Sequence, residues 1–162
     1  MGVSGAGKTT VGKLLAKELS WDFYDADTFH PPANVAKMSE GVPLTDADRQ
    51  PWLEALRAKM EEVSQQKDSA VFTSSALKAS YRDILTAGDA DPHFIYLKGS
   101  YDLLKERLEN RAGHFFKAEM LQSQLDALEE PKDALTLDIR LSPEALVAEI
   151  RERLELEKQS NI

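Results

Sequence analysis

The sequence contains no cysteine among its 162 residues, so disulfide bonds, thiolate catalysis and cysteine-ligated metal sites are excluded. It also lacks any apolar run of about 18 residues, the length that a membrane-spanning helix needs. The first residues lack the charged and apolar regions of a secretory signal peptide. We therefore expect a cytoplasmic protein without a membrane partner.

Basic residues are in the minority: 20 Lys and Arg stand against 28 Asp and Glu, for a formal net charge of -8. Nucleic acids and anionic membrane surfaces select basic proteins, so this charge argues against both as partners. An anionic substrate would need basic side chains gathered in one pocket, because the overall field repels it. The length suits one domain, which we expect to span residues 1–162.

Short apolar strands alternate with amphipathic helices, a pattern that predicts a parallel sheet with helices on both faces. The expected helices are 8–19, about 31–41, a long one from an N-cap at Asp46 through Met60, 81–85, 103–108, and one opened by Pro143. The expected strands are 21–24, 70–73, 94–97 and 135–139. With a truncated strand before Gly2, this α/β three-layer sandwich would have about five strands.

The strongest local signal is G-V-S-G-A-G-K-T at residues 2–9, which fits the phosphate-loop (P-loop) pattern G-x-x-x-x-G-K-[ST]. Its glycines let successive N–H groups turn toward one anion, and the dipole of the following helix favours the same charge. Lys8 should reach the β- and γ-phosphates of a nucleotide, ATP or GTP, and Thr9 should ligate Mg²⁺. The residues expected to bind the nucleotide are Gly2, Val3, Ser4, Gly5, Ala6, Gly7, Lys8, Thr9 and Thr10. A glycine-rich turn that merely caps a helix is the structural alternative.

Only Met1 precedes this loop, although a P-loop normally follows a buried strand. Either the central strand of the sheet is reduced to a stub, or the chain starts upstream of Met1. A missing strand would leave backbone groups of its neighbours unpaired, at about 1–3 kcal/mol for each buried group. The motif is intact, but its support is expected to be weak.

Asp25 and Asp27 are two residues apart at the end of a predicted strand, so their side chains share a face. Phosphoryl transfer to a hydroxyl needs a carboxylate close to that hydroxyl, and Mg²⁺ commonly has a carboxylate in its surroundings. Beside a P-loop, the pair therefore indicates a site for a phosphoryl acceptor. Surface acids at a strand end are the alternative.

From Asp25 onward, the chain resembles the gluconokinase family over nearly its whole length. The segments that carry the resemblance are D-A-D-T-F-H-P-P-A-N (25–34), K-M (37–38), G-V-P-L (41–44), D-A-D-R-Q-P-W-L (46–53), S-A-L-K (75–78), Y-R-D (81–83), F-I-Y-L-K-G (94–99), R-L (107–108), Arg111, G-H-F-F (113–116), M-L (120–121), S-Q (123–124) and L-E-E-P (128–131). The resemblance implies phosphorylation of D-gluconate at its 6-hydroxyl by ATP and Mg²⁺, giving 6-phospho-D-gluconate and ADP. It also implies a mobile lid around residues 111–131 and suggests a homodimer.

By this resemblance, Asp27 would be the catalytic carboxylate at the acceptor hydroxyl, and Asp25 would hold a Mg²⁺-bound water. His30 would hydrogen-bond sugar hydroxyls, unless it only caps the next helix.

Arg49 and Arg82 are the candidates for the substrate carboxylate, because a guanidinium binds carboxylates bidentately. Structural ion pairs with Asp46 or Asp83 are the alternative for these arginines. Lys78 follows a predicted strand at its carboxyl end, where open α/β sheets bind ligands. It would contribute to substrate binding or only solvate a helix.

Arg107 and Arg111 are one helical turn apart and project from one face. In a kinase of this type, Arg111 would act in catalysis by neutralising charge on the transferred phosphoryl group. Arg107 would stack on the adenine. A solvated basic stripe is the alternative for both.

Another small-molecule kinase, of the shikimate or nucleoside monophosphate type, is the nearest alternative function, although segments 25–30 and 46–52 argue against it. From a different class, the chain could be a nucleotide-binding regulatory module or an inactive truncated relative. Intact Lys8, Thr9 and Asp27 favour catalysis. A GTPase is disfavoured because no N-K-x-D guanine motif occurs.

Overall fold

The computed structural model describes residues 1–111 and 118–157. Its helices are α1 (Lys8–Leu19), the 3-10 helix η1 (Ala26–Phe29), α2 (Pro32–Ser39), α3 (Asp46–Gln65), α4 (Ala79–Thr86), α5 (Tyr101–Glu109), α6 (Ala118–Ala127) and α7 (Pro143–Arg153). Its strands are β1 (Asp22–Asp25), β2 (Ala70–Thr73), β3 (Ile95–Lys98) and β4 (Leu135–Asp138). The alternation confirms the predicted α/β class. None of the helices described is long and apolar enough to cross a membrane.

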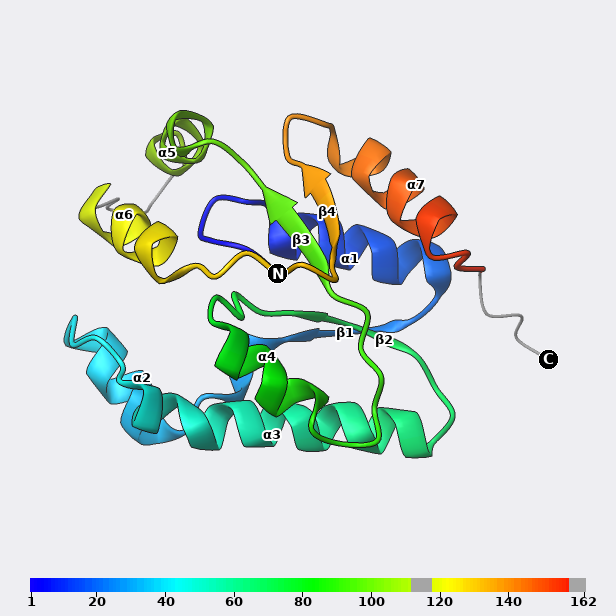
Figure 1. Ribbon diagram of the computed structural model, residues 1–162, viewed down its shortest axis with the longest axis horizontal. Helices are drawn as coiled ribbons and strands as arrows, with labels where there is room; N and C mark the ends of the chain where they lie inside the picture. The colour runs from blue at the N-terminus through cyan, green and yellow to red at the C-terminus, as the bar shows by residue number, and fades with distance from the viewer. Residues whose placement is uncertain (112–117, 158–162) are drawn as a thin grey trace.

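The strands form two parallel pairs with helices on either side (Figure 1). β1 pairs with β2, Asp22 opposite Ala70, and β3 pairs with β4, Ile95 opposite Leu135. Helices α3 and α4 lie on one side of β1 and β2, whereas α1 packs on the other side and also against α7. Each side has its own apolar core, and the core beneath α3 is centred on the fully buried Trp52. The layers are those of the predicted sandwich.

Met1 lies between the two pairs, where the first strand was expected. Its carbonyl accepts a hydrogen bond from the Leu97 N–H at 3.0 Å, and its amino group donates to the Ile95 carbonyl at 2.5 Å. On the other side, the Gly2 N–H donates to the Ser75 carbonyl at 3.3 Å. The described residues thus form four strands in two pairs, instead of one sheet of about five, because the first strand is reduced to these contacts.

A cavity of about 360 Å³ separates the beginnings of β2 and β3. Its lining includes Met1, Val71, Phe72 and Ile95, together with side chains from both cores. The four strand residues in this lining, Ala70 together with Val71, Phe72 and Ile95, are only half-buried. Because open α/β sheets bind their ligands at the carboxyl ends of the strands, this cavity at the amino ends is not the candidate active site.

The long helix α3 begins with a capping box made by Thr45, one residue before the predicted N-cap. The Asp48 N–H donates to Thr45 Oγ1 at 3.1 Å, and the Thr45 N–H donates to the Asp48 carboxylate at 2.9 Å. The prediction of Asp46 as the N-cap is therefore wrong. Asp46 is instead the first residue of the helix, from where its side chain reaches α4.

The expected lid, residues 111–131, is described at Arg111 and from Ala118 onward; the intervening residues 112–117 lie outside the described residues. Helix α6 within this segment was not predicted from the sequence. It packs against α5, and its Leu121 is fully buried in the core.

Candidate functional site

The phosphate loop has the backbone conformation that its glycines allow. Gly2, Gly5 and Gly7 have φ angles of 144°, 83° and 92°, in the region that side chains rarely adopt. A Cβ atom on Gly5 would lie 2.9 Å from the Leu108 side chain and 3.1 Å from the Leu104 carbonyl. The loop is therefore packed tightly on α5, and Gly7 leads directly into α1 as its N-cap.

Lys8 begins α1, and its ammonium group folds back over the loop. Its Nζ donates to the Val3 carbonyl at 3.0 Å. Burial lowers the pKa of Lys8, whereas the carboxylates of Asp27 and Asp25 oppose this shift. Thr9 is exposed on the first turn of the same helix, as is its neighbour Thr10. The structure thus brings together the predicted phosphate-binding residues and the predicted pair of acids.

The two acids have different environments. Asp25 ends β1, and its carboxylate accepts a hydrogen bond from the Asp27 N–H at 3.1 Å, which caps η1. The Asp27 side chain is exposed, and its charge acts on both Lys8 and His30. Asp27 is therefore accessible to a substrate, and Asp25 is held in place behind it.

His30 stacks on Trp52, with ring centroids 4.4 Å apart and an angle of 16° between the planes. Its Nδ1 lies 3.3 Å from the amide nitrogen of Asn34. Burial lowers the pKa of His30, which favours the neutral ring. The next helix, α2, has Pro31 as its N-cap and no side-chain cap, so His30 does not have the capping role. Trp52 is buried and donates to the Ala26 carbonyl at 2.7 Å, as expected of a core anchor.

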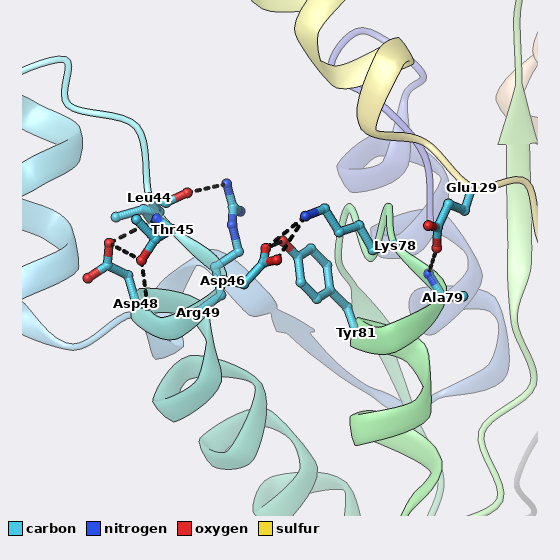
Figure 2. A network of polar contacts seen from close by, with 9 residues as sticks. All are labelled: Leu44, Thr45, Asp46, Asp48, Arg49, Lys78, Ala79, Tyr81 and Glu129. Atoms are coloured by element: carbon cyan, nitrogen blue, oxygen red, sulfur yellow. Dashed lines mark hydrogen bonds and ion pairs between the residues drawn. The ribbon is translucent and has the colours of Figure 1, made fainter.

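A polar cluster joins the beginning of α3 to α4 (Figure 2). Lys78 Nζ contacts both carboxylate oxygens of Asp46 at 2.9 Å, and the Tyr81 hydroxyl donates to the same carboxylate. These contacts lower the pKa of the Asp46 carboxyl group, with the bond from Tyr81 as the largest cause. All three residues are in segments that carry the family resemblance, but the sequence did not predict that they form one network.

Arg49 lies beside this cluster without joining it. Its guanidinium group stands 5.7 Å from the centre of the Tyr81 ring, and Nη2 contacts the Leu44 carbonyl at 3.5 Å (Figure 2). No carboxylate of the described residues lies within 4.0 Å of it, and its buried Nε has no hydrogen-bond partner among them. The alternative of an ion pair with Asp46 is therefore not realised, since Lys78 occupies that carboxylate.

Arg82 has a different environment from Arg49. It is buried, and its guanidinium donates to the carbonyl groups of Ala76, Leu77 and Glu129 at 2.8, 3.1 and 2.7 Å. These bonds tie α4 to the segment that follows α6. The geometry favours a structural role for Arg82 over the predicted contact with a substrate carboxylate.

The two arginines of α5 are also separated by their contacts. Arg107 donates to the Ile139 carbonyl after β4 and lies beside Gly7 of the phosphate loop. Arg111 is exposed just beyond the helix, and its charge lowers the pKa of Lys8. The structure therefore brings Arg111 near the phosphate loop.

The metal candidates fit a magnesium ion better than a metal held by the protein alone. Within residues 1–111 and 118–157, no group of three His, Asp or Glu side chains could hold a metal ion. Mg²⁺ typically takes one or two protein oxygens and completes its shell with water and phosphate oxygens. Thr9 offers such an oxygen on the first turn of α1, and Asp25 offers one at the end of β1.

The fold and the phosphate loop define the class of protein. A family model described as shikimate kinase matches residues 4–155. A solved shikimate kinase from Bacteroides thetaiotaomicron superposes with a TM-score of 0.62 at 20% identity, covering 96% of each chain, which shows a shared fold. The protein is thus a P-loop kinase of the small-molecule type.

Closer relatives narrow the class. The thermoresistant gluconokinase of Escherichia coli (strain K12) is 43% identical over 152 residues, 91% of this chain and 87% of the relative. The gluconokinase of Gluconobacter oxydans (strain 621H) is 50% identical over 133 residues, 82% and 75% of the two chains. A gluconokinase structure from Sinorhizobium meliloti 1021, 38% identical, superposes with a TM-score of 0.80 over 96% of this chain and 93% of that chain. The chain belongs to the gluconokinase family, as its motifs predicted.

Proposed function

We propose that this protein transfers the γ-phosphoryl group of ATP to the 6-hydroxyl of D-gluconate, giving 6-phospho-D-gluconate and ADP. The relatives named gluconokinase, at 43% and 50% identity, support the choice of substrate. The observation that carries the reaction type is the placement of an exposed carboxylate, Asp27, close enough to the P-loop lysine to act on its pKa. On this proposal, the donor phosphates and the acceptor hydroxyl would meet between Lys8 and Asp27.

On the donor side, the loop N–H groups and Lys8 would hold the phosphates. Arg111 would neutralise charge that develops on the transferred group. Arg107, bound to the Ile139 carbonyl, would lie between the phosphate loop and the region where the adenine is expected to bind. Mg²⁺, when bound by Thr9 with Asp25 nearby, would reduce the charge of the phosphates.

On the acceptor side, Asp27 would orient the 6-hydroxyl and take its proton as the new bond from oxygen to phosphorus forms. The bond from the γ-phosphorus to the bridging oxygen breaks in the same displacement, and ADP leaves. His30, neutral and stacked on Trp52, would hydrogen-bond the hydroxyls of the substrate. No covalent enzyme intermediate is needed.

At the other end of the substrate, Arg49 would bind the carboxylate of gluconate. Its guanidinium has no carboxylate partner among the described residues, whereas Lys78 is already paired with Asp46. Lys78 would then contribute charge at a distance and hold the cluster together. Arg82 would support the site through its backbone contacts.

The test is a coupled assay with ATP, Mg²⁺ and a panel of gluconate, shikimate and nucleoside monophosphates. We expect that gluconate is the only acceptor in the panel that is phosphorylated. Phosphorylation of shikimate or of nucleotides, with no phosphorylation of gluconate, would overturn the proposal. Inactivity on every acceptor would favour the alternative that the chain is an inactive relative of the kinases.

We also propose that the protein acts in the cytoplasm as a homodimer, without nucleic-acid or membrane partners. Light scattering of the purified protein tests the dimer, and a monomer mass at assay concentration would reject it.

A further inference from the structure

A side chain of α6 contacts the phosphate loop directly. The carboxamide oxygen of Gln124 accepts a hydrogen bond from the Ser4 N–H at 2.7 Å, and its Nε2 donates to Ser4 Oγ at 3.0 Å. Both halves of the carboxamide are therefore engaged by one loop residue, 120 positions away in the sequence. Neither Ser4 nor Gln124 is exposed, so water competes only partly for these bonds.

The helix that carries Gln124 is firmly placed. Leu121, one turn earlier, is fully buried, and Leu125 and Leu128 pack against the same core. Just beyond the helix, the Glu129 N–H donates to the Leu77 carbonyl at 2.9 Å. Gln124 thus reaches the loop from a helix that is packed into the core.

The other half of the Val3–Ser4 peptide is fixed within the loop, because the Val3 carbonyl accepts from the Ala6 N–H at 3.3 Å and from Lys8 Nζ at 3.0 Å. Glycines flank the segment, and they lose more conformational freedom on ordering than any other residue. Gly5 is held by contact with α5 at Leu104 and Leu108. On its other side, Ser4 is held by Gln124 alone among the hydrogen bonds that the described residues offer its N–H and hydroxyl.

We infer that Gln124 is a positioning residue for the phosphate loop: its carboxamide orders the Ser4 peptide, so that the loop is preorganised for the phosphates of ATP. The inference rests on the proposal that this loop binds ATP. Preorganisation improves affinity because less freedom is lost on binding. Removing it should weaken ATP binding and leave gluconate binding intact.

The test compares three variants by ATP binding in calorimetry and by steady-state kinetics. Gln124→Met keeps the length and apolar stem but removes both hydrogen bonds. We expect the ATP Kd and KM to rise about fivefold to tenfold, with the gluconate KM and the kcat at saturating ATP within twofold of the parent. Gln122→Met is the matched control, because Gln122 is on the same helix and, among the described residues, its side chain bonds only to Asp126. It should change neither constant.

Gln124→Glu keeps acceptors for both donors of Ser4 and adds a negative charge, so it tests whether this side chain lies close to the bound phosphates. A carboxylate can accept from both the Ser4 N–H and its hydroxyl, so the thermal midpoint should stay at the parental value. Its negative charge beside the loop should raise the ATP KM at least as much as Gln124→Met, and added salt should reduce this effect.

The outcomes are separable from those of the proposed function. If Gln124→Met binds ATP within twofold of the parent, or if Gln122→Met weakens ATP binding equally, the inference is wrong. If the parent protein binds no ATP at all, the proposed function fails first.

Discussion

The hydroxyl of Tyr81 on α4 donates a hydrogen bond to the carboxylate of Asp46 at the beginning of α3. Lys78 contacts both oxygens of the same carboxylate, whereas Arg49 makes no hydrogen bond or ion pair with it among the described residues (Figure 2). Arg49 is consequently left beside the cluster, with its charge available to a ligand. The paired Lys78 and Arg49, which is unpaired among the described residues, therefore differ as candidates for binding the substrate carboxylate, a difference that the sequence did not reveal.

Arg49→Ala should therefore weaken gluconate binding selectively. Hydrogen bonds to charged groups contribute about 1.5–3 kcal/mol, which corresponds to a gluconate KM about 10–100 times higher. The ATP KM should change little, and steady-state kinetics with each substrate varied in turn measure both. Arg57→Ala is the control, because Arg57 is on the same helix and pairs with Glu61 at 3.5 Å. Equal gluconate KM values in the two variants would reject Arg49 as the carboxylate site.

Arg82→Met should destabilise the fold and leave substrate recognition unchanged. The variant removes the donors of three carbonyl groups around a buried position. Leaving such groups unpaired costs about 1–3 kcal/mol each, so about 3–9 kcal/mol for the three, or a fall in Tm of about 6–36 °C for a chain of this size. Thermal unfolding followed by circular dichroism measures it. A parental Tm together with a raised gluconate KM would restore the role that the sequence predicted.

The sequence could predict much of the donor half of the site because its information is local. The helix predicted at 8–19 and the strand at 70–73 have the observed bounds, since apolar periodicity and a glycine-rich start define them within a few residues. The P-loop belongs to the same kind of signal, in which spacing alone specifies a backbone shape.

The acceptor half depends on contacts between distant segments. Arg82 and Arg49 have the same chemistry in the sequence, and only the fold shows that one faces backbone carbonyls and the other faces Tyr81. Helix α6 escaped prediction because its apolar pattern is ambiguous: Leu121 is buried, whereas Met120 beside it is 59% exposed. Gln124 is in one of the segments that carry the family resemblance, but no neighbouring residue in the sequence indicates that its side chain contacts Ser4.

A chain that starts at Met1 should gain stability as the pH rises between about 5 and 8, because of its amino group. Burial, reinforced by the charge of Lys8, lowers the pKa of this group from its ordinary value near 8 to about 5. In this window the unfolded chain binds a proton that the folded chain lacks, so the free energy of unfolding increases with pH. The slope approaches about 1.4 kcal/mol per pH unit and vanishes above pH 8.

Urea unfolding at several pH values measures this slope. A chain with an acetylated amino terminus is the control, because it keeps His30, whose lowered pKa acts in the same direction, and lacks the titrating amine. The difference between the two curves isolates Met1. Parallel curves from pH 5 to 8 would contradict the assignment.

Joining an apolar extended segment to Met1 should stabilise the protein by filling the cavity between β2 and β3. Val71, Phe72 and Ile95 line about 360 Å³ there, and the Met1 amino group already bonds to the Ile95 carbonyl. An added segment such as Val-Ile-Val-Val would continue this pairing between the two strands. Each buried apolar side chain contributes about 1.5–3 kcal/mol, against about 1–2 kcal/mol for ordering its backbone.

A net gain of about 2–4 kcal/mol would raise Tm by about 4–16 °C. The control is a Gly-Ser segment of equal length, which also replaces the buried amine with a peptide group but brings no apolar side chains. If both extensions shift Tm equally, the gain comes from removing the charge of the amine; if only the apolar one does, the two pairs of strands accept a strand between them. If both extended variants keep the parental Tm, the prediction is wrong, and the half-buried side chains of β2 and β3 cost the fold little stability.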